Sequence, residues 1–318
     1  MIRRTLLAVL LCGVTSSTAL AGSGPWVVGA GSTSLFAAVE AQRLTMLSTQ
    51  TPDGPVDVEV GEGLSAQGFK LIGTYGIQSR AEVELAVPWF RVYANRPDAE
   101  LCGALGLGAC RTTQGIGLVQ AKLKGLLLDE LFGSPVSLST ALNARYGAFT
   151  ADDRERITNI GEGTFDLGPS IAVGRSSAIP SGGDWSAYAE AGWLYRFANT
   201  DSFPDLDTPV PGSEFFGEIK ALVSPGEGRI GLGPSVSGLW RPWGLEWHEL
   251  EAAGGLADVD RFGALKIYNV RVGGELLLRG RSGMSLTTGA LRTVAARNNP
   301  SDVFIFSIGL GINRAPEA

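Results

Sequence analysis

Apolar residues recur at every second position of the segment Trp185-Ser-Ala-Tyr-Ala-Glu-Ala-Gly-Trp-Leu-Tyr-Arg-Phe197. Its odd positions are apolar, with aromatic residues towards both ends, whereas its even positions include the small or charged residues Ser186, Glu190, Gly192 and Arg196. This period of two predicts a β-strand with one apolar face. The aromatic side chains of Trp185 and Tyr195 are ten residues apart. A strand tilted by roughly 40° would separate them by about 25 Å, the height of the apolar band of a transmembrane β-barrel.

The same alternation recurs along the chain and predicts an all-β fold of about twelve strands. Alternation by itself also fits a soluble β-sandwich, because both architectures place apolar residues on one face. The connections separate the two, since long and short connections alternate along the sequence. Long loops at one rim, tight turns at the other and an even strand number are typical of a bacterial outer-membrane barrel with both termini in the periplasm. The expected strands lie near residues 35–46, 64–76, 81–93, 116–126, 135–149, 164–176, 185–197, 214–223, 230–241, 265–279, 283–294 and 302–313.

The composition agrees with this architecture and excludes several others. The 318 residues include 44 glycines, roughly twice the ordinary usage, while only 18% of the residues are charged. A net charge of −6 argues against nucleic acid as a partner, because such proteins need a basic face. Beyond residue 21 no run of about 18 apolar residues occurs, which argues against a helical membrane protein.

The N-terminus predicts secretion. A basic Arg3-Arg4 pair precedes a short apolar run, and Ala19-Leu20-Ala21 offers the small residues that a signal peptidase reads. We therefore expect a signal peptide at residues 1–21 and a short periplasmic or lumenal segment at 22–34, too short for a plug domain. The barrel would then occupy 35–313 and a C-terminal tail 314–318. These boundaries place the protein in the outer membrane after export through the inner membrane.

One hairpin resembles a known family. Tyr75-Gly-Ile-Gln-Ser-Arg-Ala-Glu-Val-Glu-Leu-Ala-Val-Pro-Trp89 is similar to a hairpin of the outer-membrane proteins named for the meta-pathway of phenol degradation. Asp166-Leu-Gly-Pro-Ser170 and Ala191-Gly-Trp-Leu-Tyr-Arg-Phe197 resemble later strands of that family. The resemblance implies a FadL-like barrel that is inserted by the barrel-assembly machinery. It also implies passive, porin-like uptake of small hydrophobic or aromatic solutes.

The chain departs from this pattern at both ends. Its last strand does not finish on an aromatic residue but continues to Ala318, and no clear counterpart of an N-terminal hatch is found.

If the apolar faces meet lipid, the alternate residues line the lumen. Their charges are nearly balanced, which predicts a permeation path without strong ion selectivity. The alternative is a narrow interior that salt bridges merely fill, because unpaired charges away from water are costly. The expected lumen-lining residues are Glu82, Glu84, Lys122, Lys124, Arg145, Glu190, Arg196, Glu218, Lys220, Arg271 and Glu275.

Other residues suggest structural roles more readily than chemistry. Cys102 and Cys110 share a glycine-rich loop and would form a local disulfide in an oxidising compartment. The single histidine, His248, has no accompanying nucleophile motif, so we expect no enzyme activity, and no sequence motif indicates a cofactor or a metal site. Expected interfacial aromatics are Trp89, Trp185, Trp193, Tyr195, Trp240, Trp243 and Trp247.

Prolines interrupt three of the expected strands, at Pro88, Pro169 and Pro234. Proline removes a ladder hydrogen bond and could weaken a strand pair enough for lateral opening towards the membrane, although a harmless kink near a rim is the favoured explanation. The sequence thus predicts a passive outer-membrane channel. The alternatives are a structural or adhesive barrel that transports nothing and, less favoured, an outer-membrane hydrolase that uses His248.

Overall fold

Twelve long antiparallel strands close into a barrel in the described part of the chain. The computed structural model describes residues 24–94, 113–147, 164–198, 213–246, 248–249, 265–280 and 283–315. None of the helices in these ranges is long and apolar enough to cross a membrane. The twelve strands are β1 (Thr33–Thr51), β2 (Gly54–Gln78), β3 (Ala81–Ala94), β5 (Val119–Leu128), β6 (Ser137–Tyr146), β7 (Thr164–Ala178), β8 (Gly183–Ala198), β9 (Glu214–Pro225), β10 (Ile230–Arg241), β11 (Ile267–Arg279), β12 (Met284–Arg297) and β14 (Val303–Arg314).

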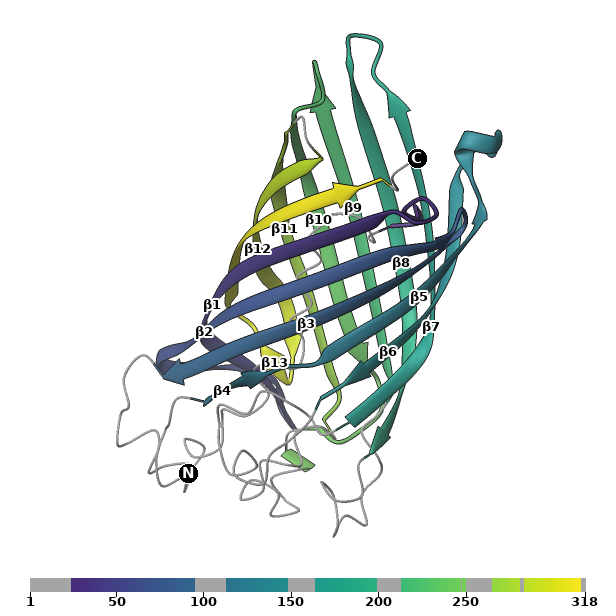
Figure 1. Ribbon diagram of the computed structural model, residues 1–318. Coiled ribbons are helices and arrows are strands. Elements are labelled where there is room, and N and C mark those ends of the chain that lie inside the picture. The colour runs from purple at the N-terminus through teal and green to yellow at the C-terminus, as the bar shows by residue number, and fades with distance from the viewer. Residues whose placement is uncertain are drawn as a thin grey trace.

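Strand β1 closes the barrel, because it pairs with β2 on one side and with β14 on the other. Thr33 opposes both Tyr75 of β2 and Arg314 of β14, so the sheet has no free edge at this seam. Closure satisfies the backbone hydrogen bonds that an open sheet would leave exposed. Figure 1 shows the strands running obliquely around the closed wall. The predicted all-β barrel is therefore confirmed.

The connections are sorted between the two ends of the barrel, as the sequence predicts. At the end that we call the short-turn end, four connections contain two to four residues each, and a fifth holds the short helix η2 (Glu130–Phe132). Gly182 and Gly226 adopt positive φ angles in two of these turns, a conformation that favours glycine. Most of the connections at the opposite, long-loop end lie outside the described residues.

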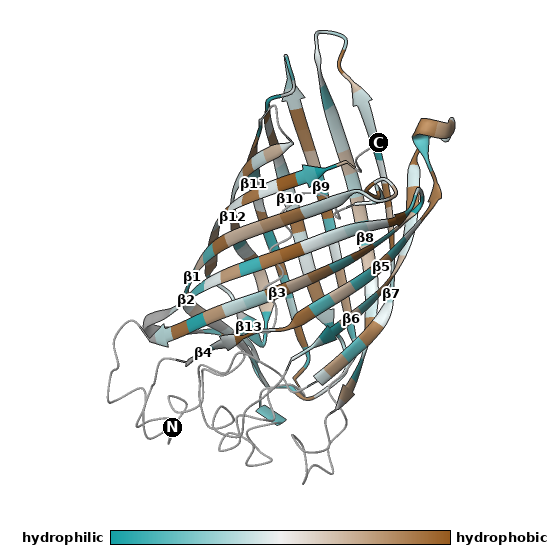
Figure 2. Ribbon diagram, viewed as in Figure 1, coloured by the Kyte–Doolittle hydropathy of each residue, from teal (hydrophilic) through white to brown (hydrophobic). Residues whose placement is uncertain are grey.

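Apolar side chains are exposed on the outside of the barrel and charged side chains are buried inside, the reverse of a soluble protein. Outward-facing residues such as Val39 and Ile219 are each 61% exposed, whereas the inward-facing charges of Asp166 and Arg196 are 0% and 1% exposed. Figure 2 shows the cause, because hydrophobic and hydrophilic residues alternate along the strands. The alternation that the sequence shows therefore separates an apolar outer wall from a polar interior.

One expected loop is wrong. Residues 47–63 do not form a long loop, because β1 continues to Thr51 and β2 begins at Gly54, with a tight turn between them. The segment after the turn alternates valines with Asp57 and Glu59, and Asp53-Gly54 is a common hairpin turn. The interval between the expected strands 35–46 and 64–76 is therefore an extended hairpin.

Two smaller strands were also missed. The expected strand 116–126 is divided into β4 (Thr113–Ile116) and β5, which pair with successive parts of β3. Strand β13 (Asn299–Pro300) pairs with β1 at Leu47 and Ser48, within the expected loop 295–301. The expected strand 135–149 is shorter, since β6 ends at Tyr146.

Candidate functional site: the barrel interior

Three clusters of charged residues lie on the inner face of the barrel. The structure places every lumen-lining residue expected from the sequence at an inward-facing position, and most of these side chains are buried. The clusters follow the barrel from the long-loop end to the short-turn end. The first two join strands that are not all neighbours, and the third joins the neighbouring strands β3 and β5 to the N-terminal segment.

The first cluster lies near the long-loop end and links β6 to β10. Glu214 is 2.5 Å from Arg145 and 3.2 Å from Arg241, measured from carboxylate oxygen to guanidinium nitrogen. Asp166 is 3.0 Å from Arg145 and 3.1 Å from Arg196. Three guanidinium groups therefore share two carboxylates. Arg241 was not among the expected lumen-lining residues. Its side chain points inward because it lies two residues after Leu239, which also points inward from β10.

The second cluster lies at mid-barrel. Lys122 of β5 reaches Glu190 of β8 at 2.6 Å, across the polar side chains of Asn143 and Ser170. The Tyr188 hydroxyl of β8 donates to the Glu218 carboxylate of β9 at 3.1 Å. A further ion pair, Lys220 with Glu275 at 2.5 Å, spans β9 to β11.

The third cluster lies at the short-turn end and holds the N-terminal segment, residues 24–32. Glu82 of β3 and Lys124 of β5 form a buried ion pair of 2.7 Å. Lys124 also donates to the carbonyl oxygens of Gly24 and Trp26, at 3.1 and 2.8 Å, and Glu82 accepts from the backbone N–H of Val28 at 2.7 Å. Each member of the pair therefore binds both its partner and the segment.

The N-terminal segment crosses the interior from one wall to the other. At one end it joins β2, because Gly31 donates to the Gly76 carbonyl at 2.8 Å. At the other end the Trp26 ring meets Tyr188 of β8 edge-on, with ring centroids 6.1 Å apart. Strand β8 is six strands away from β1 in either direction around the barrel. The segment therefore spans the lumen at the short-turn end, an arrangement that the sequence alone did not show.

The β5–β6 connection at the short-turn end also holds this segment. Glu130, the first residue of η2, accepts from the Trp26 indole N–H at 3.3 Å and from the Ser176 backbone N–H of β7 at 3.0 Å. The segment is thus bound by side chains from both halves of the wall.

The interior is not uniformly polar. Three inward-facing phenylalanine rings each cover a glycine on a neighbouring strand: Phe36 covers Gly309, Phe90 covers Gly68 and Phe216 covers Gly192. A Cβ added at any of these three glycines would collide with the ring above it. Aromatic rings thus occupy inner positions of the wall alongside the charged side chains.

The expected interfacial aromatics lie on outward-facing parts of the wall. Trp193, Trp240 and Trp243 are exposed, and the ring of Phe215 is 5.5 Å from Trp240 and 5.8 Å from Trp243 between centroids. Trp89 and Tyr195 are also exposed, whereas Trp185 is half-buried near the start of β8. Trp247 lies outside the described residues.

All three prolines coincide with interruptions of a strand ladder. Near Pro169, β7 and β8 lack paired residues between Leu167 and Ser170, and near Pro234, β9 and β10 lack them between Leu232 and Ser235. Pro88 lies where β3 changes partner from β5 to β4.

The other candidate residues from the sequence are two cysteines and one histidine. Cys102 and Cys110 lie outside the described residues. His248 Nδ1 lies 3.4 Å from the carbonyl oxygen of Gln50 in the β1–β2 hairpin. Within the described ranges, no group of three or more His, Cys, Asp or Glu residues could hold a metal ion.

Comparison with solved structures supports the barrel fold. The chain is similar to an outer membrane channel from Pseudomonas putida F1, with a TM-score of 0.62 and 14% identity over 93% of this chain and 100% of that one. Its likeness to the NanC porin is weaker, with a TM-score of 0.46 and 7% identity over 86% of this chain and 98% of that one. The sequence matches no protein-family model and no curated protein. At 14% identity, the likeness to the Pseudomonas putida channel shows the fold alone.

Proposed function

We propose that the protein is an outer-membrane channel that admits small hydrophobic or aromatic solutes by passive diffusion. The observation that carries this proposal is the closed barrel with an apolar outer wall and a charged interior. A wall that exposes large apolar side chains on strand after strand is stable in hydrocarbon and not in water. A closed barrel also leaves no unsatisfied sheet edge in the membrane.

Further features support the cellular placement. The expected signal peptide at 1–21 would export the chain, and the sorted connections would place the long loops outside the cell and the short turns in the periplasm. The likeness to the outer membrane channel adds support at the level of the fold.

The proposed solute class rests on the interior and on the family resemblance. Inner charges occur mainly as close pairs, such as Lys122 with Glu190 and Lys220 with Glu275, so they offer little selection for an ion of either sign. The inward rings of Phe90 and Phe216 instead provide apolar contact for an aromatic solute. The FadL-like hairpin at Tyr75–Trp89 favours the same class.

The N-terminal segment sets the narrowest part of the proposed route. A solute that travels along the barrel axis must pass the segment or displace it from Glu82, Lys124 and Tyr188. A second route opens sideways, because the β9–β10 ladder is interrupted beside Pro234, an outward-facing proline. We assign the axial route to hydrated ions and the lateral one to apolar solutes.

Single-channel recording in a planar bilayer tests this function. The wild type should give discrete openings of low conductance, and a variant that lacks residues 24–30 should conduct several-fold more, because the segment no longer spans the lumen. A variant that lacks residues 316–318 serves as a control that shortens the other terminus. Added benzyl alcohol should reduce the open-channel current, whereas glycerol at the same concentration should not.

Other outcomes would favour the alternatives. A stably inserted barrel that stays electrically silent even without residues 24–30 would contradict the channel and favour a structural or adhesive role. A hydrolytic activity lost in His248→Ala would instead favour an enzyme.

A further inference from the structure

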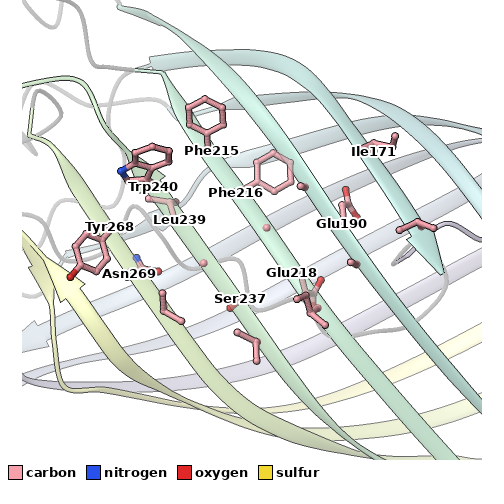
Figure 3. Close-up of a pocket in the computed structure, with 18 of the residues that line it drawn as sticks. Ile171, Glu190, Phe215, Phe216, Glu218, Ser237, Leu239, Trp240, Tyr268 and Asn269 are labelled. Atoms are coloured by element: carbon pink, nitrogen blue, oxygen red, sulfur yellow. The ribbon is translucent and has the colours of Figure 1, made fainter. Parts of the chain in front are cut away.

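A hollow of about 790 Å³ lies on the outward-facing wall between β6 and β11. Strands β6 and β7 contribute only outward-facing residues to it, namely Leu138, Ile171 and Val173. Inward-facing residues of β8 to β11 also border it, as expected for a hollow whose floor is the sheet itself. Figure 3 shows Phe215 and Trp240 beside one another at one end.

The strand register explains why the wall is hollow here. Ala191, Gly217, Gly238 and Val270 form one outward-facing row across β8 to β11. The adjacent row towards the long loops is aromatic. It consists of Trp193, Phe215, Trp240 and Tyr268. A row with two glycines and an alanine thus lies directly beside a row of large rings.

The backbone conformation does not require glycine at Gly217 or Gly238. Neither has a positive φ angle. A Cβ added at Gly217 would lie 3.4 Å from its nearest neighbour, the carbonyl oxygen of Glu190, and at Gly238 it would lie 3.3 Å from the carbonyl oxygen of Asn269. Both sites therefore accept a side chain with little adjustment, unlike Gly192, whose added Cβ would collide with Phe216.

Glycine inside a strand weakens it relative to alanine. It often marks a place where a ligand or another backbone approaches closely. Two adjacent glycines without a local backbone reason therefore point to an occupant of the hollow.

The shape of the hollow favours a flexible chain over a second protein surface. Ile171, Ile219 and Trp240 rise around the glycine floor and are 53%, 61% and 54% exposed. A rigid sheet would rest on these side chains and could not reach the floor. A polymethylene chain is narrow enough to enter between them and bury the glycine row.

We infer that this hollow is a binding site for an acyl chain of a membrane lipid, in the leaflet nearer the long loops. The inference rests on the proposed membrane placement, because the hollow is continuous with the apolar wall that would face lipid. It does not depend on conduction through the lumen. The aromatic row would lie at the interface, with the headgroup above it and the chain beneath.

Native mass spectrometry tests this site. The protein is first reconstituted in dioleoylphosphatidylcholine vesicles and then solubilised in detergent. The wild type should retain a phosphatidylcholine molecule at collision energies that strip other lipids. Gly217→Leu, which fills the hollow, should lose this adduct. Gly73→Leu is the matched control, because Gly73 also faces outward, between Leu35 and Leu85, and an added Cβ there meets nothing within 4 Å.

Several outcomes would overturn the inference. Equal lipid retention in wild type and Gly217→Leu would do so, as would a wild-type dimer that Gly217→Leu converts to a monomer, which would make the hollow an interface between copies. If toluene is added to the sample and the wild type retains it in place of phosphatidylcholine, the hollow is a solute site. Single-channel currents from the same vesicles test the proposed function separately, and Gly217→Leu should conduct like the wild type.

Discussion

Glu214 is the charged side chain on which the interior depends most. Its carboxylate lies within 4 Å of the guanidinium groups of Arg145, Arg196 and Arg241, and it is 1% exposed. Removing one partner from a buried ion pair leaves the other charge without compensation, which costs more than the pair itself contributes. The two carboxylates of this cluster therefore keep three cations stable inside the wall.

Glu214→Gln should accordingly lower the free energy of unfolding by about 3–5 kcal/mol. Urea unfolding in detergent micelles, followed by tryptophan fluorescence, measures the change. Glu227→Gln is the control, because its ion pair with Arg229 is largely exposed and such pairs contribute about 1 kcal/mol or less. Equal destabilisation by both substitutions would show that the cluster is solvated and not a stabilising core.

At the scale of the elements, the β1–β2 hairpin divides into a part in the wall and a part beyond it. Up to Leu44, β1 pairs with both β2 and β14. From Thr49 to Thr51 it pairs only with β2 among the described strands, and a register shift separates the two parts between Leu44 and Met46. The far part of the hairpin is therefore an appendage of the barrel.

Replacing residues 49–56 with Asn-Gly should therefore leave the barrel intact. The expected result is a midpoint of urea unfolding that changes little, because no wall strand loses a strand partner and the replacement removes only local bonds such as that from the Gln50 N–H to Asn298 at 2.8 Å. The same replacement at residues 126–136, which contain η2, serves as a contrast, since it removes Glu130 and its hydrogen bonds to Trp26 and Ser176. A hairpin variant that fails to fold would show that the appendage nucleates the wall.

At the scale of the whole molecule, closure and the inverted burial act together. The ladder between β1 and β14 joins the first and last strands of the barrel over twelve residue pairs. Opening the barrel at this seam would expose an edge on each strand and, inside a membrane, would leave their backbone groups without partners. The barrel is thus expected to unfold as one unit.

A cooperative barrel of this kind should migrate faster in an SDS gel when it is not boiled. Boiling should slow it to the position of the unfolded chain, because the closed wall resists SDS until it is heated. Gel migration before and after heating is the measurement. A protein that shows no such shift and stays soluble without detergent would contradict the proposed membrane placement.

Much of the barrel follows from local alternation in the sequence. A strand exposes alternate residues to opposite faces, so patterns such as Trp185–Phe197 predict both the strands and the side of the wall on which each side chain lies. The sorting of connection lengths then distinguishes a barrel from a sandwich. The same alternation assigns Arg241, the last residue of the expected strand 230–241, to the interior, although it was not among the expected lumen-lining residues.

Only the tertiary structure shows contacts that join distant segments. The sequence has no periodic pattern in residues 24–32, so nothing local reveals that Trp26 reaches Tyr188 on the opposite wall or that Lys124 binds the segment. The hollow at Gly217 and Gly238 likewise depends on the register between β9 and β10. Alternation within one strand determines which way a side chain points, whereas the pairing of strands far apart in the sequence determines what it meets.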